Sequence, residues 1–328
     1  MMDTTPTLAV TDLKTHFFTK AGVVKAVDGV SFEVKAGEVL GLVGESGSGK
    51  SITGFSILGL IDAPGRVVAG SIKFKGEEIA TAPEERQRHL RGNRIAMIFQ
   101  DPMMTLNPVL RVDTQMIEAV RAHQPVSASV ARGMALDALS LVGIPAPESR
   151  LRNYPHELSG GMRQRVAIAI AFINKPDLII ADEPTTALDV TIQAQILHEA
   201  QQLCAKTGTA MVWITHDLAI VSALADRIAV MYAGRIVETG TTAEIVGRPY
   251  HPYTKGLIGS VPSANRRGER LMQIPGMTPS VMNLPAGCAF QSRCSRRGQG
   301  CDAEQAVTEL APGRLVRCCR PLVEEVAL

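Results

Sequence analysis

One short segment constrains the fold of this chain more than any other: the glycine-rich stretch Gly44–Ser51, which reads GESGSGKS. It fits the pattern G-x-x-x-x-G-K-[S/T] and lies between an apolar run, Val39–Val43, and a stretch of helical character, Ile52–Leu60. A near-continuous apolar run suits a strand buried on both faces of an α/β sheet. Glycines let backbone N–H groups turn inward around phosphate oxygens, and the start of the following helix adds a favourable dipole. The context therefore favours a P-loop over a glycine-rich turn that happens to contain a lysine.

The residue types of this loop match the chemistry of a bound nucleoside triphosphate. Lys50 would place a positive charge beside the β- and γ-phosphates, and the Ser51 hydroxyl would be a ligand of Mg²⁺. The predicted nucleotide-binding residues of the loop are Gly44, Glu45, Ser46, Gly47, Ser48, Gly49, Lys50 and Ser51.

A pair of acids follows a second apolar run, Leu178–Ala181. Asp182 stands where a carboxylate at the carboxyl end of a strand would hold Mg²⁺ beside a P-loop. Glu183 is then suited to orient or deprotonate the attacking water. Two acids after a strand also fit a solvated loop, and the P-loop upstream is what favours the metal site.

Further apolar runs at Arg94–Phe99 and Ala210–Ile214 extend the predicted sheet. A long helical stretch, about residues 104–171, separates the first of these runs from Leu178–Ala181 and predicts a helical insert in an α/β domain. The predicted breaks in this stretch are Gly143–Pro145 and Tyr154–Pro155.

Short alternating segments at Leu8–Val10 and Val30–Val34 predict antiparallel strands near the N-terminus. A hairpin is predicted over Ile228–Glu238, with its turn at Ala233-Gly234. From about residue 247 the composition shifts to Pro, Gly, Arg and Cys with weak periodicity. We therefore expect one domain over residues 1–246 and a small extension over 247–328.

The charge balance bears on the class of partner. The chain has 328 residues, with 34 Lys plus Arg against 32 Asp plus Glu, for a net charge of +2. A dedicated nucleic-acid binder usually has a strong basic excess, so no nucleic-acid partner is expected. No signal peptide is visible, and no apolar run approaches the ~18 residues of a spanning helix, so the chain is expected to stay in the cytosol.

Four more motifs carry a resemblance to a known family. Leu158–Arg165 resembles the signature motif of the ABC-transporter ATPases, with Met162 in place of a common glutamine. Phe99–Pro102 looks like the glutamine loop of that family, Ala187–Asp189 like the loop that crosses the dimer, and Thr215–Asp217 like the switch histidine. With the P-loop and the acidic pair, six motifs stand in the family's order. The resemblance implies an α/β fold: an ABC-type P-loop NTPase core with a mixed or parallel sheet, an antiparallel β subdomain and a helical insert, followed by a small Cys-rich extension.

The resemblance also implies site roles. Glu183, His216 and Gln100 would be catalytic, and Ser51, Gln100 and Asp182 would hold Mg²⁺. In the family, the signature helix grips a γ-phosphate bound to the P-loop of an opposite subunit, so that dimer closure completes each site. The residues implied for that contact are Ser159, Gly160, Gly161 and Asp189. An aromatic residue that stacks on adenine could be Phe17 or Phe18, and core burial fits them equally well.

The HPYT stretch in Arg248–Leu257 resembles the peptide/nickel importer subfamily, and the chain is most similar to the dipeptide-permease ATP-binding subunits. This implies an ATP hydrolase that energises import of dipeptides or short peptides, peripheral to the cytoplasmic face of the inner membrane. Its implied partners are a second homologous ATPase, two transmembrane permease subunits and an extracytoplasmic peptide-binding protein. Oligopeptides, glutathione or nickel are alternative cargoes. A soluble ABC ATPase that acts on DNA or ribosomes and a redox-sensing module are alternatives of other classes.

Five of the six cysteines lie between residues 288 and 319. Four thiolates could hold Zn²⁺ or a [4Fe–4S] cluster, and the wide spacing favours the cluster, as does the subfamily. Unliganded thiols or a disulfide stay open, and so does the choice between Cys318 and Cys319 as the fourth ligand. The expected ligands are Cys288, Cys294, Cys301 and Cys318. Nearby arginines could offset the charge of the cluster or form a solvated face.

Overall fold

The computed structural model describes residues 5–185, 190–261 and 273–322, and in these the chain forms two compact units. Unit 1 comprises the N-terminal residues up to Thr7 together with Val34–Val39 and Thr81–Trp213. Unit 2 comprises Leu8–Glu33, Leu40–Ala80 and Ile214–Leu328. The predicted α/β fold, with parallel and antiparallel strand pairs, is confirmed. The boundary predicted at residues 246/247 falls inside unit 2 and stays a prediction.

Unit 2 contains an antiparallel sheet in the order β2-β1-β4-β5. Its strands are β1 (Leu8–Thr19), β2 (Gly22–Val34), β4 (Gly65–Phe74) and β5 (Glu77–Glu78). Leu8 pairs with Phe74 and Val10 with Ile72, and these four side chains are buried. Alternation of apolar and polar residues places this apolar set on one face, as expected for a strand exposed on the other.

The remaining strands of unit 2 run in the order β11-β12-β10-β9-β3. They are β3 (Val39–Val43), β9 (Arg227–Tyr232), β10 (Arg235–Thr241), β11 (Thr308–Ala311) and β12 (Arg314–Val316). β3 pairs with β9 in parallel, and β9 and β10 form the predicted hairpin. Its turn lies at Ala233 and Gly234, whose φ angles of 46° and 82° give the left-handed conformation that tight hairpins require.

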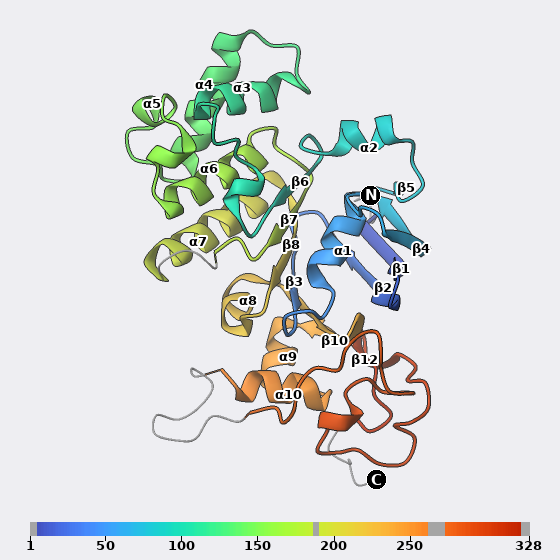
Figure 1. Cartoon of the computed structure of the whole chain (residues 1–328). Coiled ribbons are helices and arrows are strands. Elements are labelled where there is room, and N and C mark those ends of the chain that lie inside the picture. The colour runs from blue at the N-terminus through green and yellow to red at the C-terminus, as the bar shows by residue number, and fades with distance from the viewer. Residues whose placement is uncertain (1–4, 186–189, 262–272, 323–328) are drawn as a thin grey trace. The chain divides into compact units, whose positions relative to one another are not determined.

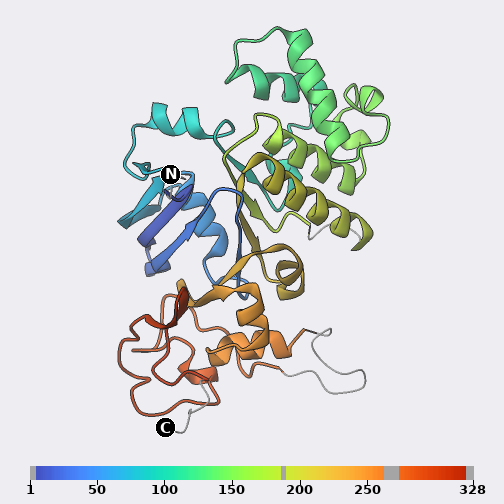
Figure 2. The same cartoon turned by 180° about the vertical axis from the view of Figure 1, so that it is seen from behind.

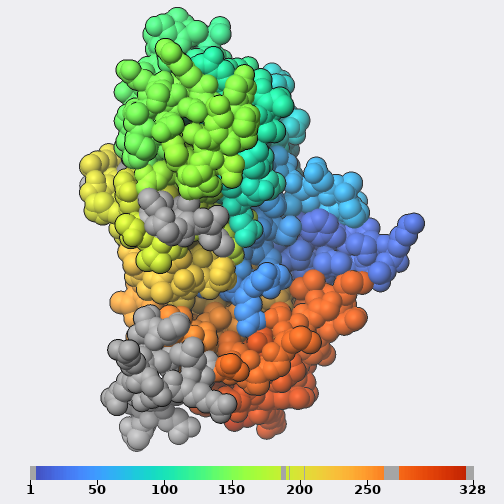
Figure 3. Space-filling view, turned by 60° about the vertical axis from the view of Figure 1, so that its left-hand side comes forward, coloured from blue at the N-terminus to red at the C-terminus, as the bar shows by residue number. Residues whose placement is uncertain are grey.

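The C-terminal extension joins this strand set, because β12 pairs with β10. The helices of unit 2 are α1 (Lys50–Ile57), α8 (Leu218–Leu224), α9 (Thr242–Gly247), α10 (Pro252–Gly259) and η4 (Gln291–Arg293). Beyond α10 the extension is mostly irregular coil (Figure 2). Figure 3 shows the orange-red extension packed against blue segments of the same unit.

Unit 1 is built on β6 (Ile95–Ile98), β7 (Leu178–Asp182) and the first part of β8 (Ala210–Thr215). β6 and β7 pair in parallel, and every residue of β7 is buried, as its apolar sequence predicts. The helices of unit 1 are α2 (Glu84–Leu90), η1 (Pro102–Met104), α3 (Val112–Arg121), α4 (Ala128–Leu141), α5 (Pro147–Arg150), η2 (Pro155–Glu157), α6 (Gly160–Phe172) and α7 (Val190–Thr207).

The helical insert therefore consists of several short helices, and α6 packs between β6 and α4 (Figure 1). The breaks predicted near residues 143–145 and 154–155 are confirmed. A further break between α3 and α4 was missed. Pro125 lies in it and Ser127 caps α4, its hydroxyl accepting a hydrogen bond from the Val130 amide. Across the described ranges, no helix is long and apolar enough to cross a membrane.

Candidate nucleotide site

The P-loop joins β3 to α1 in unit 2, and two of its glycines are required by close backbone contacts. A Cβ at Gly44 would lie 2.1 Å from the Met231 carbonyl oxygen, and one at Gly49 would lie 2.2 Å from the Ala26 carbonyl oxygen. Gly49 also has a φ of 100° at the N-cap of α1. These positions exclude any side chain, so the sequence pattern has a direct steric reason.

Lys50 begins α1 and points back into the loop. Its Nζ donates to the carbonyl oxygens of Gly44 at 2.8 Å and Glu45 at 2.9 Å, and lies 3.3 Å from Ser48 Oγ. The side chain is almost fully buried, so its ammonium group is held at the centre of the loop. Ser51 follows it in the first turn of α1. A buried cation enclosed by a glycine-rich loop at a helix start fits a nucleotide phosphate chain.

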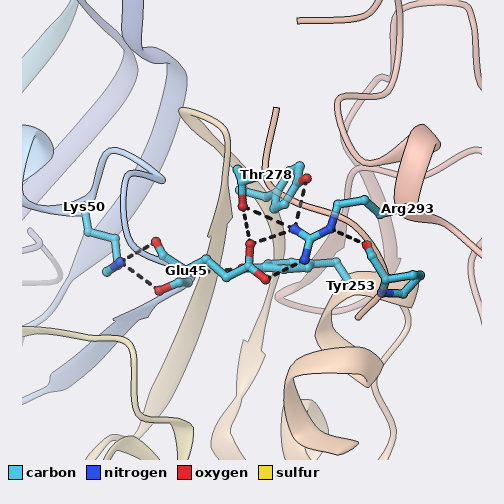
Figure 4. Close-up of polar contacts among 8 residues, drawn as sticks. Glu45, Lys50, Tyr253, Thr278 and Arg293 are labelled. Carbon is cyan, nitrogen blue, oxygen red and sulfur yellow. Dashed lines mark hydrogen bonds and ion pairs between the residues drawn. The ribbon is translucent and has the colours of Figure 1, made fainter. Parts of the chain in front are cut away.

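Glu45, the second residue of the P-loop, is contacted by the C-terminal extension (Figure 4). Its carboxylate accepts two hydrogen bonds from Arg293, at 2.7 and 3.0 Å, and one from Thr278 Oγ1. Its backbone N–H donates to Tyr253 Oη at 2.9 Å. Burial acts to raise the pKa of Glu45, but the hydrogen bonds from Arg293 and Thr278 outweigh it and hold the pKa below its ordinary value.

In unit 1, the acidic pair lies at the end of β7, as predicted. Asp182 is 5% exposed, and Glu183 follows it with a φ of 45°, which is uncommon for a residue with a side chain. Gln100 Nε2 donates to Glu183 Oε2 at 3.2 Å. The structure thus brings together two of the three residues predicted to be catalytic. Their roles stay a prediction.

The signature segment of unit 1 begins α6. Ser159 is its N-cap, and the Ser159 hydroxyl accepts a hydrogen bond from the Met162 amide at 3.3 Å. Gly160 is exposed, and a Cβ on it would meet open space. Arg165, on the buried side of the same helix, donates to the carbonyl oxygens of Val142 and Gly143. These bonds anchor α6 on its buried side, whereas Ser159 and Gly160 at the start of the helix are exposed.

Three other predicted features have different outcomes. His216, at the end of β8 in unit 2, is exposed. Asp189, predicted in the loop that crosses the dimer, lies outside the described residues. Phe18 is exposed, and Arg66 Cζ lies 4.4 Å from the centre of its ring. Phe17 pairs with Gly65 in the antiparallel sheet. The choice between them as the adenine-stacking residue stays a prediction.

The prediction of a [4Fe–4S] cluster, or of zinc, on Cys288, Cys294, Cys301 and Cys318 is wrong. Among the described residues, no group of three or more His, Cys, Asp or Glu side chains is placed to hold a metal ion. These cysteines and Cys319 do line one cavity, but its volume of about 10 Å³ is no larger than one water requires.

Burial raises the pKa values of Cys288 and Cys294, and raises that of Cys318 to about 11. The Sγ atoms of Cys301 and Cys319 lie 3.9 Å apart, and none of the described cysteines forms a disulfide. The spacing of the cysteines predicted their proximity and missed the lack of space between them.

The sequence also missed how two tail arginines are used. Arg293 pairs with Glu45, and Arg314 pairs with Glu238 at 2.8 Å, with Arg314 2% exposed and Glu238 fully buried. The sequence suggests two roles for the arginines near the cysteines, to which both belong: to offset the charge of a cluster or to form a solvated face. A buried arginine needs a carboxylate partner, but no local pattern tells which of the acids of the chain it will meet.

His251 was another residue without a predicted role, and it gives unit 2 a testable pH dependence. It is fully buried, its Nδ1 accepts a hydrogen bond from the Tyr253 amide at 3.0 Å, and burial lowers its pKa to about 3. The unfolded chain takes up this proton near pH 6.5, so the contribution to stability is complete above that pH and is lost as the pH falls. The expected loss is about 1.4 kcal/mol per pH unit between about pH 6 and 4.

Urea unfolding of wild type and His251→Asn at pH 7 and pH 5 measures this contribution. Asparagine still caps α10 but does not titrate, so the variant should show a pH slope shallower by one proton. Equal slopes in the two proteins would show that His251 is not the group responsible.

A P-loop between a buried strand and a helix, with an acidic pair at the end of another strand, defines a P-loop NTPase. The chain belongs to the ABC transporter family, in the branch of the dipeptide and oligopeptide transport ATP-binding proteins. The family described as ABC transporter matches residues 27–186, and the one described as oligopeptide/dipeptide transporter, C-terminal region, matches residues 237–301.

The similar proteins agree with this assignment. The dipeptide transport ATP-binding protein DppD of Escherichia coli is 49% identical over 316 residues, covering 96% of this chain and 97% of that protein. The oligopeptide transport ATP-binding protein OppD of E. coli is 46% identical, with 97% of this chain and 94% of that protein covered. Among solved structures, the ATP-binding cassette MJ0796, a dimer in a post-hydrolysis state bound to ADP and Pi, superposes with a TM-score of 0.66 at 25% identity, over 72% of this chain and 98% of that one.

Proposed function

We propose that this protein binds and hydrolyses ATP to energise the import of dipeptides or short peptides by an ABC transporter. The observation that supports it most is that the peptide-transport relatives align over nearly the whole chain, extension included. The P-loop geometry agrees, since Lys50 lies buried among the loop carbonyls where it can exchange these partners for phosphate oxygens.

The predicted site residues are proposed to have the following roles. Lys50 and the loop amides would hold the phosphates, and Ser51, Asp182 and Gln100 would hold Mg²⁺, which when bound neutralises charge on the phosphate oxygens. Glu183 would accept the proton of the attacking water, with its carboxylate oriented by Gln100. His216 would contact the γ-phosphate.

The signature residues would act on a second nucleotide. We propose that Ser159, Gly160 and Gly161 at the open start of α6, together with Asp189, contact ATP on a homologous ATPase subunit. Two permease subunits and an extracytoplasmic peptide-binding protein would complete the transporter. The chain would work as a peripheral subunit on the cytoplasmic side of the membrane, where ATP is available.

Growth on defined peptides tests the proposal. A deletion strain should lose growth on dipeptides as the sole source of a required amino acid, and the wild-type gene should restore it. Lys50→Ala should fail to restore growth, because the loop loses its buried cation. Restoration by Lys50→Ala would contradict the role of ATP, and a defect confined to longer peptides or to nickel would contradict dipeptides as the cargo.

A further inference from the structure

The extension holds Glu45 at both its main chain and its side chain. The two carboxylate oxygens accept one hydrogen bond each from Nη1 and Nη2 of Arg293, and the backbone N–H donates to Tyr253 Oη. The carbonyl oxygen of Glu45 accepts from Lys50 Nζ on the other side. Glu45 therefore links the extension to the lysine at the centre of the P-loop (Figure 4).

Arg293 is itself held rigidly. It is 7% exposed, and its Nε donates to the Pro275 carbonyl oxygen at 2.9 Å. Its guanidinium also lies 5.9 Å from the ring centres of Tyr232 and Phe290, and Nη1 is 3.4 Å from Tyr232 Oη. A planar guanidinium with bonds in several directions has one orientation, so it fixes the carboxylate that it meets.

We propose that Arg293, acting through Glu45, is a positioning residue of the nucleotide site, and that the extension thereby sets the shape of the P-loop. This inference rests on the proposed function, since it assumes that the loop binds ATP. Arg293 does not itself belong to the loop, and its effect on the nucleotide passes through Glu45.

The physical link is the short path from Glu45 to Lys50. Lys50 Nζ is placed by the carbonyl oxygens of Gly44 and Glu45, both of which belong to the segment that Arg293 anchors. If Glu45 loses that anchor, those carbonyls shift and the ammonium group shifts with them. Errors of about 1 Å in the position of a binding group can lower activity roughly a hundredfold, so a smaller displacement should weaken ATP binding measurably.

The test compares Arg293→Met with Arg314→Met in the full chain, by calorimetric titration with Mg-ATP. Both changes remove a buried arginine of unit 2 from its carboxylate, so both should lower stability. Of these two arginines, Arg293 bonds to Glu45 of the P-loop, whereas Arg314 bonds to Glu238 and to the Arg248 carbonyl oxygen. We expect Arg293→Met to raise the Kd for Mg-ATP about tenfold and Arg314→Met to leave the Kd of the folded fraction within about twofold of wild type.

Glu45→Gln supplies a second variant should Arg293→Met not fold. It keeps the main-chain bonds and the size of the side chain but loses the charge that Arg293 holds, and the Kd should again rise about tenfold. Where both single variants fold, the double variant should bind no more weakly than Arg293→Met, because the two changes break one interaction.

The outcomes separate the two claims. If wild type binds Mg-ATP and Arg293→Met, or Glu45→Gln in its place, binds equally well, the positioning role is overturned and the proposed function stands. An equal rise of Kd in Arg293→Met and Arg314→Met would also overturn it, since a general loss of packing would explain both. If the wild-type chain does not bind Mg-ATP, the proposed function itself is wrong.

Discussion

Glu183→Gln is expected to bind ATP as tightly as the wild-type chain and to hydrolyse it roughly 100-fold to 10,000-fold more slowly. Glutamine has the shape of glutamate and can still accept the hydrogen bond from Gln100, but it cannot take a proton from water. The local geometry should survive, because the φ of 45° at this position is set by the end of β7 and by the backbone around it.

ATPase assays on the assembled transporter, paired with nucleotide binding by the purified chain, separate the two effects. Glu85→Gln is the matched control, since Glu85 is an exposed carboxylate in the first turn of α2 in the same unit. It should leave the rate unchanged. Turnover of Glu183→Gln at the wild-type rate would remove Glu183 from the role of general base.

The local conformation of the P-loop could be predicted because it depends on residues that are close together in the sequence. Gly44, Gly49 and Lys50 are constrained by their immediate neighbours, so a strand, a loop and a helix start are enough to specify them. The same holds for Asp182 and for the cap at Ser159. The helix predicted from Ile52 begins two residues earlier, at Lys50, because Gly49 takes the N-cap position.

The contacts of the extension could not be predicted because they join distant parts of the chain. Glu45 and Arg293 are 248 residues apart, and nothing in the composition around either residue points to the other. The prediction of a metal site on the cysteines is wrong for a related reason. Their spacing shows that Cys288 and Cys301 can lie in one segment, but the pKa values of the thiols and the space between them depend on how the coil packs.

The other large expected effect is on stability, in the buried pair of Glu238 and Arg314. Glu238 accepts from Arg314 Nη2 at 2.8 Å and from the backbone amides of Tyr250 and His251, so it joins β10, β12 and the start of α10. Glu238→Gln keeps an acceptor oxygen for only one of the two amides and leaves Arg314 as an uncompensated buried charge. Breaking such a pair costs about 3–5 kcal/mol, so the free energy of unfolding should fall by about that amount.

Urea unfolding of the full chain measures this loss, with Glu304→Gln as the control. Glu304 is an exposed acid of the extension, and its change should stay within about 0.5 kcal/mol. The double variant Glu238→Gln with Arg314→Met decides the mechanism. Because it buries no unpaired charge, it should be clearly less destabilised than the sum of the two single variants. Additive losses would mean that the two side chains act by separate packing, in which case the ion pair is not what joins the extension to β10.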